Sequence, residues 1–158
     1  MEWKLDRTDH EILACFQKNA RISNKELAAT VGLAPSSCLS RVQRLRAEGI
    51  LGEAHAVVAP AAMGIGLQAL VAVRLRQHSR QQVKAFWKHA LGLEEVLAVY
   101  HLSGAQDFLV HLAVRDTAHL RDLALDAFTA RPEVGQIETS LLFDHAVKPV
   151  LPNLNAMT

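Results

Sequence analysis

The residues best suited to binding chemistry lie between positions 36 and 46, where three arginines occur without an acidic residue. An arginine side chain can fork onto the edge of a guanine or pair with a phosphate. Serine and glutamine can reach bases or phosphate oxygens. These residue types indicate DNA contact, and the candidates on this segment are Ser36, Ser37, Ser40, Arg41, Gln43 and Arg44.

The segment that carries these side chains is predicted to be two short helices joined by a tight turn. Ser23 and Glu26 have the spacing of a capping box, which marks a helix start. Gly32 can end that helix in a left-handed conformation. Pro35 suits the first turn of the next helix, and Gly49 ends it. A short helix, a turn containing glycine and a helix with a basic outer face are typical of a helix-turn-helix.

The apolar residues of the second helix recur at every third position. Leu39, Val42 and Leu45 are therefore predicted to pack against the preceding helices, including one capped by Asp6. At the start of the first of the two helices, Asn24 and Lys25 are candidates for phosphate contact, because a helix N-terminus favours anions. On spacing and charge alone, an ordinary amphipathic helix with a solvated basic face remains the alternative.

Charge is distributed unevenly along the chain. The net charge of the 158 residues is only +1. Residues 1–52 carry eight Lys/Arg against six Asp/Glu, whereas residues 53–158 carry nine against ten. This local excess of positive charge is expected if one end of the chain meets DNA.

Composition and motifs argue against several other classes of protein. No stretch of 18 apolar residues lacks a charge and the N-terminus is highly charged, so we expect no membrane segment and a cytoplasmic, nucleoid-associated protein. Cys15 and Cys38 lack C-x-x-C spacing, and the eight histidines form no metal-binding motif. The chain has no glycine-rich phosphate loop and no G-x-S-x-G, so we expect neither an enzyme nor a metal or other cofactor.

A composition change near position 60 predicts a domain boundary. Glu53 to Val58 is predicted to be a short strand, either a wing beside DNA or a strand for dimer pairing. Residues 59–66 contain proline and two glycines among small residues and are predicted to be a linker. We therefore expect a helix-turn-helix domain over residues 1–58 and a second domain over residues 67–158.

The second half is predicted to alternate strands and helices in the order β-α-β-β-α-β. Ser79 and Asp116 begin its two helices, and a turn at residues 104–107 joins its middle strands. This order is the ferredoxin-like motif, in which both helices cover one face of an antiparallel sheet. The open face needs a cover, most simply a second copy of the chain, so we expect a homodimer. The predicted strands are 67–76, 96–103, 108–114 and 137–147.

Two sets of residues resemble the Lrp/AsnC (feast/famine) transcriptional regulators. The first runs from Asn19-Ala20-Arg21-Ile22-Ser23 through Val31-Gly32-Leu33 to Glu48-Gly49-Ile50. The second consists of Ser103-Gly104-x-x-Asp107-Phe108 between two strands and Glu138-Thr139-Ser140 with Val147-Lys148 in the last strand. The resemblance spans about residues 4–148, with two departures: Ala34 stands where the family often has Ser or Thr, and the 104–107 turn lacks a second acid.

The resemblance implies an α+β fold, with a winged-helix-like three-helix domain before a ferredoxin-like αβ sandwich. It implies a sequence-specific regulator that binds double-stranded DNA, forms dimers that assemble into octamers or other rings, and responds to an amino acid or related small molecule. The implied effector site contains Ser103, Gly104, Gln106, Asp107, Gln136 and Thr139.

Two other functions stay open from the sequence. One is a DNA-architectural protein that has no effector. The other is a small-molecule sensor that acts on protein partners, which predicts no salt-dependent affinity for DNA.

Overall fold

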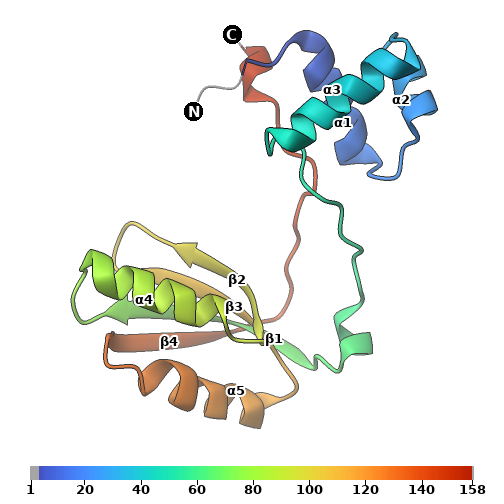
Figure 1. The fold of residues 1–158 in the computed structure, drawn as a ribbon. Helices are drawn as coiled ribbons and strands as arrows, with labels where there is room; N and C mark the ends of the chain where they lie inside the picture. Colours follow the sequence, from blue (N-terminus) through green and yellow to red (C-terminus); the bar gives the residue numbers. More distant parts are fainter. Residues whose placement is uncertain (1–3, 158) are drawn as a thin grey trace. The chain divides into compact units, whose positions relative to one another are not determined.

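The structure, a computed structural model, describes residues 4–157 and separates into two compact units. The helical unit comprises residues 1–56 and 146–158, and the sheet unit comprises residues 57–145 (Figure 1). The expected second domain ran to residue 158, whereas the structure groups residues 146–158 with the helices.

The helical unit contains α1 (Arg7–Lys18), α2 (Asn24–Thr30) and α3 (Pro35–Ala47). Asp6 and Asp9 form a capping box at α1, and Ser23 and Glu26 form one at α2. α3 begins at Pro35 without a side-chain cap, because Ala34 has no hydrogen-bonding group to offer. The fully or almost fully buried apolar residues of this unit are Ile12, Leu27, Ala28, Cys38, Val42 and Leu45.

The inward face of α3 differs from the prediction at one position. Cys38 is fully buried beside Val42 and Leu45, whereas 46% of Leu39 is exposed. The spacing 38, 42, 45 follows the turn of an α-helix more closely than strict repetition at every third residue, which drifts around the helix. The prediction that Leu39 packs inward was therefore wrong, and the helix presents this leucine to solvent.

The strand predicted over Glu53 to Val58 is not formed. These residues have no regular secondary structure, and no strand among residues 4–157 pairs with them. An isolated strand leaves its backbone groups without ladder partners, so β-branched residues alone do not stabilise it. The described part of the chain accordingly has no wing beside α3.

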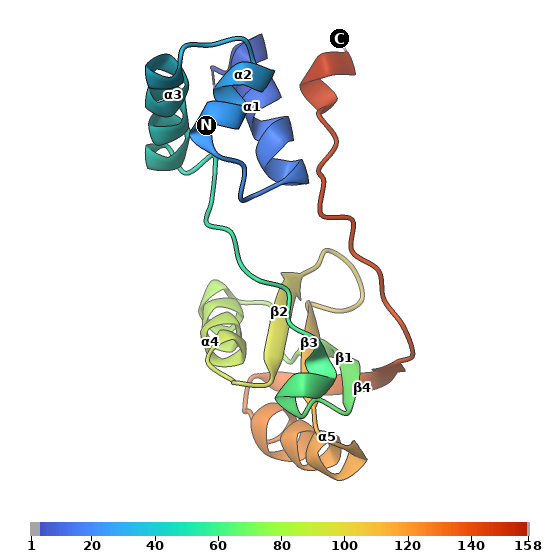
Figure 2. The same ribbon diagram turned by 90° about the vertical axis from the view of Figure 1, so that its right-hand side faces the viewer.

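The sheet unit is a four-stranded antiparallel sheet in the order β2-β3-β1-β4. Its strands are β1 (Leu67–Leu75), β2 (Val96–His101), β3 (Phe108–Val114) and β4 (Val134–Leu142). One helix, α4 (Arg80–Leu91), connects β1 to β2; α5 (Thr117–Leu123) continues into the π-helix η2 (Ala124–Thr129) before β4. Short 3-10 turns, η1 (Pro60–Met63) and η3 (Leu154–Met157), lie outside this arrangement. The chain order β-α-β-β-α-β and the antiparallel sheet are those of the predicted ferredoxin-like fold (Figure 2).

Both helical segments cover the same face of the sheet. Phe86 on α4 contacts Phe108 on β3 and Phe128 on η2, with ring centroids 4.7 Å and 6.2 Å apart. All three rings are fully buried. On α4, Phe86 and Ala90 occupy the line of contact with the sheet, whereas Trp87 and Leu91 are exposed.

The last strand is displaced from its prediction. It was expected over 137–147, but β4 begins at Val134, where a bulge lets Leu75 pair with it. It ends at Leu142, which pairs with Gln68 near the start of β1. Backbone pairing requires a neighbour, so the length of β1 sets both ends of β4.

Candidate functional site

The outward face of α3 is the first candidate site. Ser36, Ser37, Ser40 and Gln43 are all exposed on it, as predicted for residues that contact DNA. Leu39 lies among them, and a spacing of three or four residues puts it beside Ser36 and Gln43. An exposed leucine in this position is suited to the methyl group of a thymine. The sequence prediction missed Leu39 because it counted every apolar residue of the helix as core.

Arg41 and Arg44 have partners within the helical unit. Nη1 of Arg41 donates to Oδ2 of Asp6 at 2.6 Å and to Oδ1 of Asp9 at 2.9 Å. Nη2 of Arg44 donates to Oδ2 of Asp9 at 2.6 Å. Both carboxylates lie at the start of α1, more than 30 positions away in the sequence. The two arginines therefore connect the candidate recognition helix to α1, in addition to any contact with DNA.

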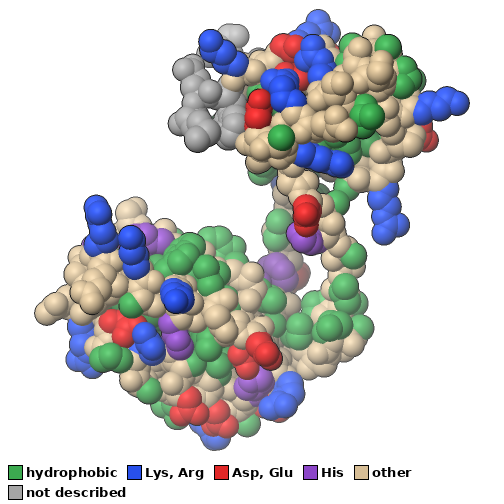
Figure 3. All heavy atoms as spheres, viewed as in Figure 1, with side chains coloured by type: hydrophobic (Ala, Val, Ile, Leu, Met, Phe, Trp, Pro, Cys, Tyr) green, Lys and Arg blue, Asp and Glu red, His purple; other side chains and the backbone are tan. Residues whose placement is uncertain are grey.

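Ion pairing keeps these carboxylates charged. The pKa of Asp6 lies below its ordinary value, mainly because the Asp9 N–H and Arg41 donate to it. Burial tends to raise the pKa of Asp9, but hydrogen bonds from Arg44, the Asp6 N–H and Arg41 outweigh it, so this pKa is also lowered. The positive charge of the two arginines is thus balanced locally. Figure 3 shows acidic and basic side chains interspersed on the visible face of the helical unit.

The two candidates on α2 have different environments. Nδ2 of Asn24 donates to the carbonyl of Pro35 at 2.9 Å, which joins the start of α2 to the start of α3. Lys25 is exposed beside it. Asn24 therefore stabilises the turn between the helices, and Lys25 is the more accessible of the two for a phosphate.

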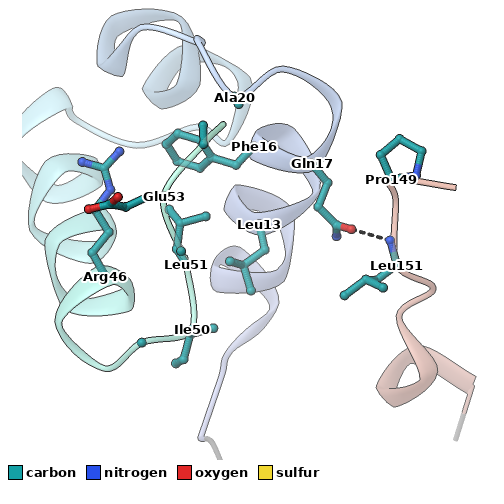
Figure 4. Close-up of a pocket in the computed structure, with 13 residues that line it drawn as sticks. Leu13, Phe16, Gln17, Ala20, Arg46, Ile50, Leu51, Glu53, Pro149 and Leu151 are labelled. Carbon is teal, nitrogen blue, oxygen red and sulfur yellow. Dashed lines mark hydrogen bonds between the residues drawn. The ribbon is translucent and has the colours of Figure 1, made fainter. Parts of the chain in front are cut away.

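A groove occurs elsewhere on the helical unit, between α1, the segment after α3 and the C-terminal segment (Figure 4). Leu13, Phe16, Ile50 and Leu51 supply much of its apolar lining. Oε1 of Gln17 accepts a hydrogen bond from the N–H of Leu151, so the C-terminal segment forms one side of this groove.

The second candidate site is the turn between β2 and β3. Ser103 and Gly104 are exposed there, and Gly104 has a φ of +140°, which favours glycine. The carbonyl oxygen Oε1 of Gln106 is buried and has no hydrogen-bond partner among the described residues. Such a group is costly to leave unsatisfied and can accept a hydrogen bond from a ligand.

Asp107 belongs to the effector site that the family resemblance implies, and both of its carboxylate oxygens have partners in the protein. Oδ2 accepts from the backbone N–H of Leu75 at 2.7 Å, and Oδ1 lies 2.6 Å from Nδ1 of His78. The carboxylate thereby fastens the turn to the end of β1. The side chain of His78 is 63% exposed and stacks on His101 with ring centroids 5.9 Å apart, so it is the partner that solvent or a ligand can reach.

The structure separates the two candidates on β4. Gln136 pairs with Arg74 on the open face of the sheet, at the same end of β1 as Asp107. Thr139 pairs with Val71, which belongs to the helix-covered face. Side chains alternate along a strand, so residues three positions apart point to opposite faces. Within one copy of the chain, Gln136 and Thr139 do not line one pocket.

Two other kinds of feature are absent from the described residues. Among residues 4–157, no group of three or more His, Cys, Asp or Glu side chains is arranged to hold a metal ion. Across the same residues, no helix is long and apolar enough to span a membrane.

Known families match both units. An AsnC-type helix-turn-helix domain model matches residues 5–46, and an Lrp/AsnC ligand binding domain model matches residues 68–150. The HTH-type transcriptional regulator AldR of Mycolicibacterium smegmatis is 40% identical over 141 residues, which cover 89% of this chain and 82% of that protein. A leucine-responsive regulatory protein of Rhizobium meliloti is 32% identical over 138 residues, covering 87% of this chain and 88% of its own.

Solved structures agree in fold along almost the whole chain. A transcriptional regulator of Neisseria meningitidis in complex with L-Met has a TM-score of 0.85 and 28% identity, and the match covers 98% of this chain and all of that one. The crystal structure of MtbAldR has a TM-score of 0.75 and 34% identity, covering 94% of this chain and all of that one. The relatives are transcriptional regulators and not enzymes. With an AsnC-type helix-turn-helix followed by an Lrp/AsnC ligand-binding domain, this chain belongs to the Lrp/AsnC family of transcriptional regulators.

Proposed function

We propose that α3 enters the major groove of DNA and reads bases with Ser36, Leu39, Ser40 and Gln43. The observation that carries this proposal is the exposed stripe that these four side chains form on α3. Arg41 and Arg44 flank the stripe and supply charge toward guanine or phosphate. Ser37, Asn24 and Lys25 lie near the adjoining helix starts, where backbone phosphate is favoured.

The test is a selection of sheared genomic DNA on the purified protein at about 0.15 M salt, where weak non-specific binding is largely screened. Enrichment of fragments that share a two-fold motif supports the proposal and identifies the targets. If only weak binding remains and disappears as the salt concentration rises, the proposal fails.

We also propose that the protein acts as a homodimer through the open face of the sheet. Leu70 and Ala72 on β1 and Leu109 on β3 lie there between the strands, and half of Tyr100 on β2 is exposed on the same face. A partner sheet would remove these apolar side chains from water. A dimer would also space two recognition helices about 34 Å apart, as successive major grooves require.

Sedimentation of the wild type and of a Tyr100→Lys variant tests the dimer. We expect the variant to shift toward the monomer, because it places a charge in the apolar interface. Assembly of dimers into an octamer or another ring would appear in the same experiment as a larger species.

For the sheet unit, we propose an amino-acid effector bound at the β2–β3 turn. The buried, unpartnered Oε1 of Gln106 supports a ligand there, with Ser103, Gly104 and Asp107 beside it and Gln136 at the same end of the sheet. Thr139 would join only if a second copy supplied it. The Neisseria regulator that resembles this chain was crystallised with L-Met.

A thermal-shift screen of the common amino acids tests the effector. A true effector raises the melting temperature with its concentration. One observation favours the alternative of an effector-independent DNA-architectural protein: both oxygens of Asp107 already have partners. If the screen gives no shift and DNA binding persists, this alternative is the better description.

A further inference from the structure

The carboxylate of Asp9 is buried and receives hydrogen bonds from the candidate recognition helix. Only 1% of the residue is exposed. Its Oδ1 accepts from Arg41 and its Oδ2 accepts from Arg44 and from the N–H of Asp6. A single acid on α1 therefore binds two arginines on neighbouring turns of α3. Asp6 adds a second carboxylate to Arg41 alone.

These contacts leave part of each guanidinium group free. A guanidinium carries five N–H bonds in a planar fork. Asp6 and Asp9 engage Nη1 of Arg41 and Nη2 of Arg44, and within residues 4–157 no protein acceptor lies on the remaining nitrogens. The side chains of Arg41 and Arg44 are 33% and 39% exposed. Together with Lys4, Ser40 and the carboxylates of Asp6 and Asp9, they line a shallow hollow at the surface. The guanidinium groups of Arg41 and Arg44, held by these carboxylates, therefore present their remaining N–H donors toward solvent.

Two consequences follow for an arginine held in this way. Its direction is set before DNA arrives, which reduces the ordering required on binding. Its charge is partly neutralised, which weakens attraction to phosphate, the source of non-specific affinity. An arginine without the carboxylate could instead turn toward the nearest phosphate of any sequence.

We propose that Asp9 is a positioning residue that determines specificity: it holds Arg41 and Arg44 for base contact and lowers the affinity of α3 for DNA of arbitrary sequence. This inference rests on the proposed function, in which α3 reads the major groove. In this proposal, a buried residue of α1 controls the ratio of specific to non-specific binding without touching DNA itself.

The test compares Asp9→Asn with Glu11→Gln. Both substitutions remove one negative charge from α1, but Glu11 pairs with Arg7 on the exposed side of the helix, and within residues 4–157 it has no hydrogen bond or ion pair to α3. For each protein, affinity is measured for a fragment from the genomic selection and for a scrambled duplex of equal length, across a series of salt concentrations. Circular dichroism checks that each variant is folded.

For Asp9→Asn we expect the affinity for scrambled DNA to rise about threefold to tenfold, and the ratio of specific to scrambled affinity to fall at least as much. The salt dependence on scrambled DNA should steepen by about one to two units, since each added phosphate contact contributes about 0.9. Glu11→Gln should keep the wild-type ratio to within about twofold, because its charge change is not at the DNA-facing arginines.

Several results would overturn the proposal. One is an Asp9→Asn variant whose affinity ratio and salt dependence match those of Glu11→Gln. Another is a proportional loss on both duplexes, which indicates a merely structural role. If Asp9→Asn does not fold, Asp6→Asn replaces it, because asparagine keeps the N-cap and removes one of the two carboxylates that hold Arg41, while Arg44 keeps its contact with Asp9. The salt dependence of Asp6→Asn on scrambled DNA should steepen by about half as much as expected for Asp9→Asn. A salt dependence equal to that of the wild type would contradict the inference. If the wild type itself shows no preference for the selected fragment, the proposed function fails first.

Discussion

Asp9 in the helical unit and Asp107 in the sheet unit are both acids at candidate binding sites, and in both the protein satisfies the carboxylate. They differ in what remains available to a ligand. Around Asp9, the candidate ligand-binding groups are the arginines, and each keeps free N–H donors that face outward. Around Asp107, the candidate group is the carboxylate itself, and both of its oxygens are engaged.

This difference has a physical consequence. The surface of α3 that we propose reads DNA is organised before its partner arrives, so binding there need not first break an internal contact. At the turn between β2 and β3, the proposed effector would have to replace His78 on Asp107 with its ammonium group, so binding there would compete with an internal hydrogen bond. The comparison can be tested by substitutions that act on one unit and leave the other unchanged.

The largest effect is expected in the core of the sheet unit. Phe86→Ala removes a fully buried ring between Phe108 and Phe128, which should lower the free energy of unfolding by about 3–5 kcal/mol. Leu91→Ala, at an exposed position of the same helix, should change it by about 0.5 kcal/mol or less. Hydrogen exchange measured by peptide should show the loss in β1 and β3 and normal protection in α1 and α3. Equal loss in both units would show that they do not behave independently.

A smaller effect is expected from the two neighbouring residues that the structure assigns to opposite sides of α3. Cys38→Ser buries a hydroxyl in an apolar core and should cost about 1–3 kcal/mol if it stays unpaired, as measured by denaturant unfolding. Leu39→Ala should leave stability within about 1 kcal/mol, because the side chain is half-exposed. On DNA, Leu39→Ala should weaken preference at one thymine by about 1 kcal/mol or more. A larger loss of stability for Leu39→Ala than for Cys38→Ser would contradict the observation that Cys38, and not Leu39, faces the core.

The contact between His78 and Asp107 should give a weaker effect, on effector binding. His78→Ala releases Oδ1 of Asp107, and an exposed pair of this kind contributes about 0.2–1 kcal/mol. The variant should therefore bind an amino-acid effector up to about fivefold more tightly by calorimetry. Arg80→Ala, at an exposed position just beyond this contact, serves as the control. Weaker binding by His78→Ala would mean that the histidine contacts the effector instead of competing with it.

The smallest effect is expected from pH. Burial lowers the pKa of His111, with a further contribution from the charge of His145, so the folded sheet unit disfavours the proton that the unfolded chain accepts below about 6.5. Its stability is complete above that pH and decreases as the pH falls. The lowered pKa values of Asp6 and Asp9 act in the same direction, but only below their ordinary value of 3.8.

Hydrogen exchange at pH 7.5 and 5.5, corrected for intrinsic rates, measures this difference. Protection should decrease slightly around His111 on β3 and remain unchanged in α1. His111→Gln can still bond to Gln68 but cannot titrate, so it should remove the pH dependence. If protection in α1 also decreased between pH 7.5 and 5.5, a titrating group other than His111 would control the stability of the helical unit.

Much of the fold could be predicted because many signals are local. The capping residues Asp6, Ser23, Ser79 and Asp116 all accept the backbone hydrogen bond expected at a helix start. Strand β3 also begins and ends where predicted. The prediction failed where an outcome depends on a distant partner. The segment at 53–58 has no strand to pair with, and β4 ends at Leu142, opposite Gln68 near the start of β1.

By itself, the sequence determined the order of the helices and strands within each unit and the outward polar residues of α3, because helix caps, turns and periodicity depend on residues within a few positions. Only the tertiary structure decided the partners of Arg41, Arg44 and Asp107, which lie 29 to 35 positions away along the chain. It also placed Gln136 and Thr139 on opposite faces, since the register against β1 sets the direction of each side chain. Local spacing shows which groups a helix or turn can present, whereas packing decides which of them the protein has already used.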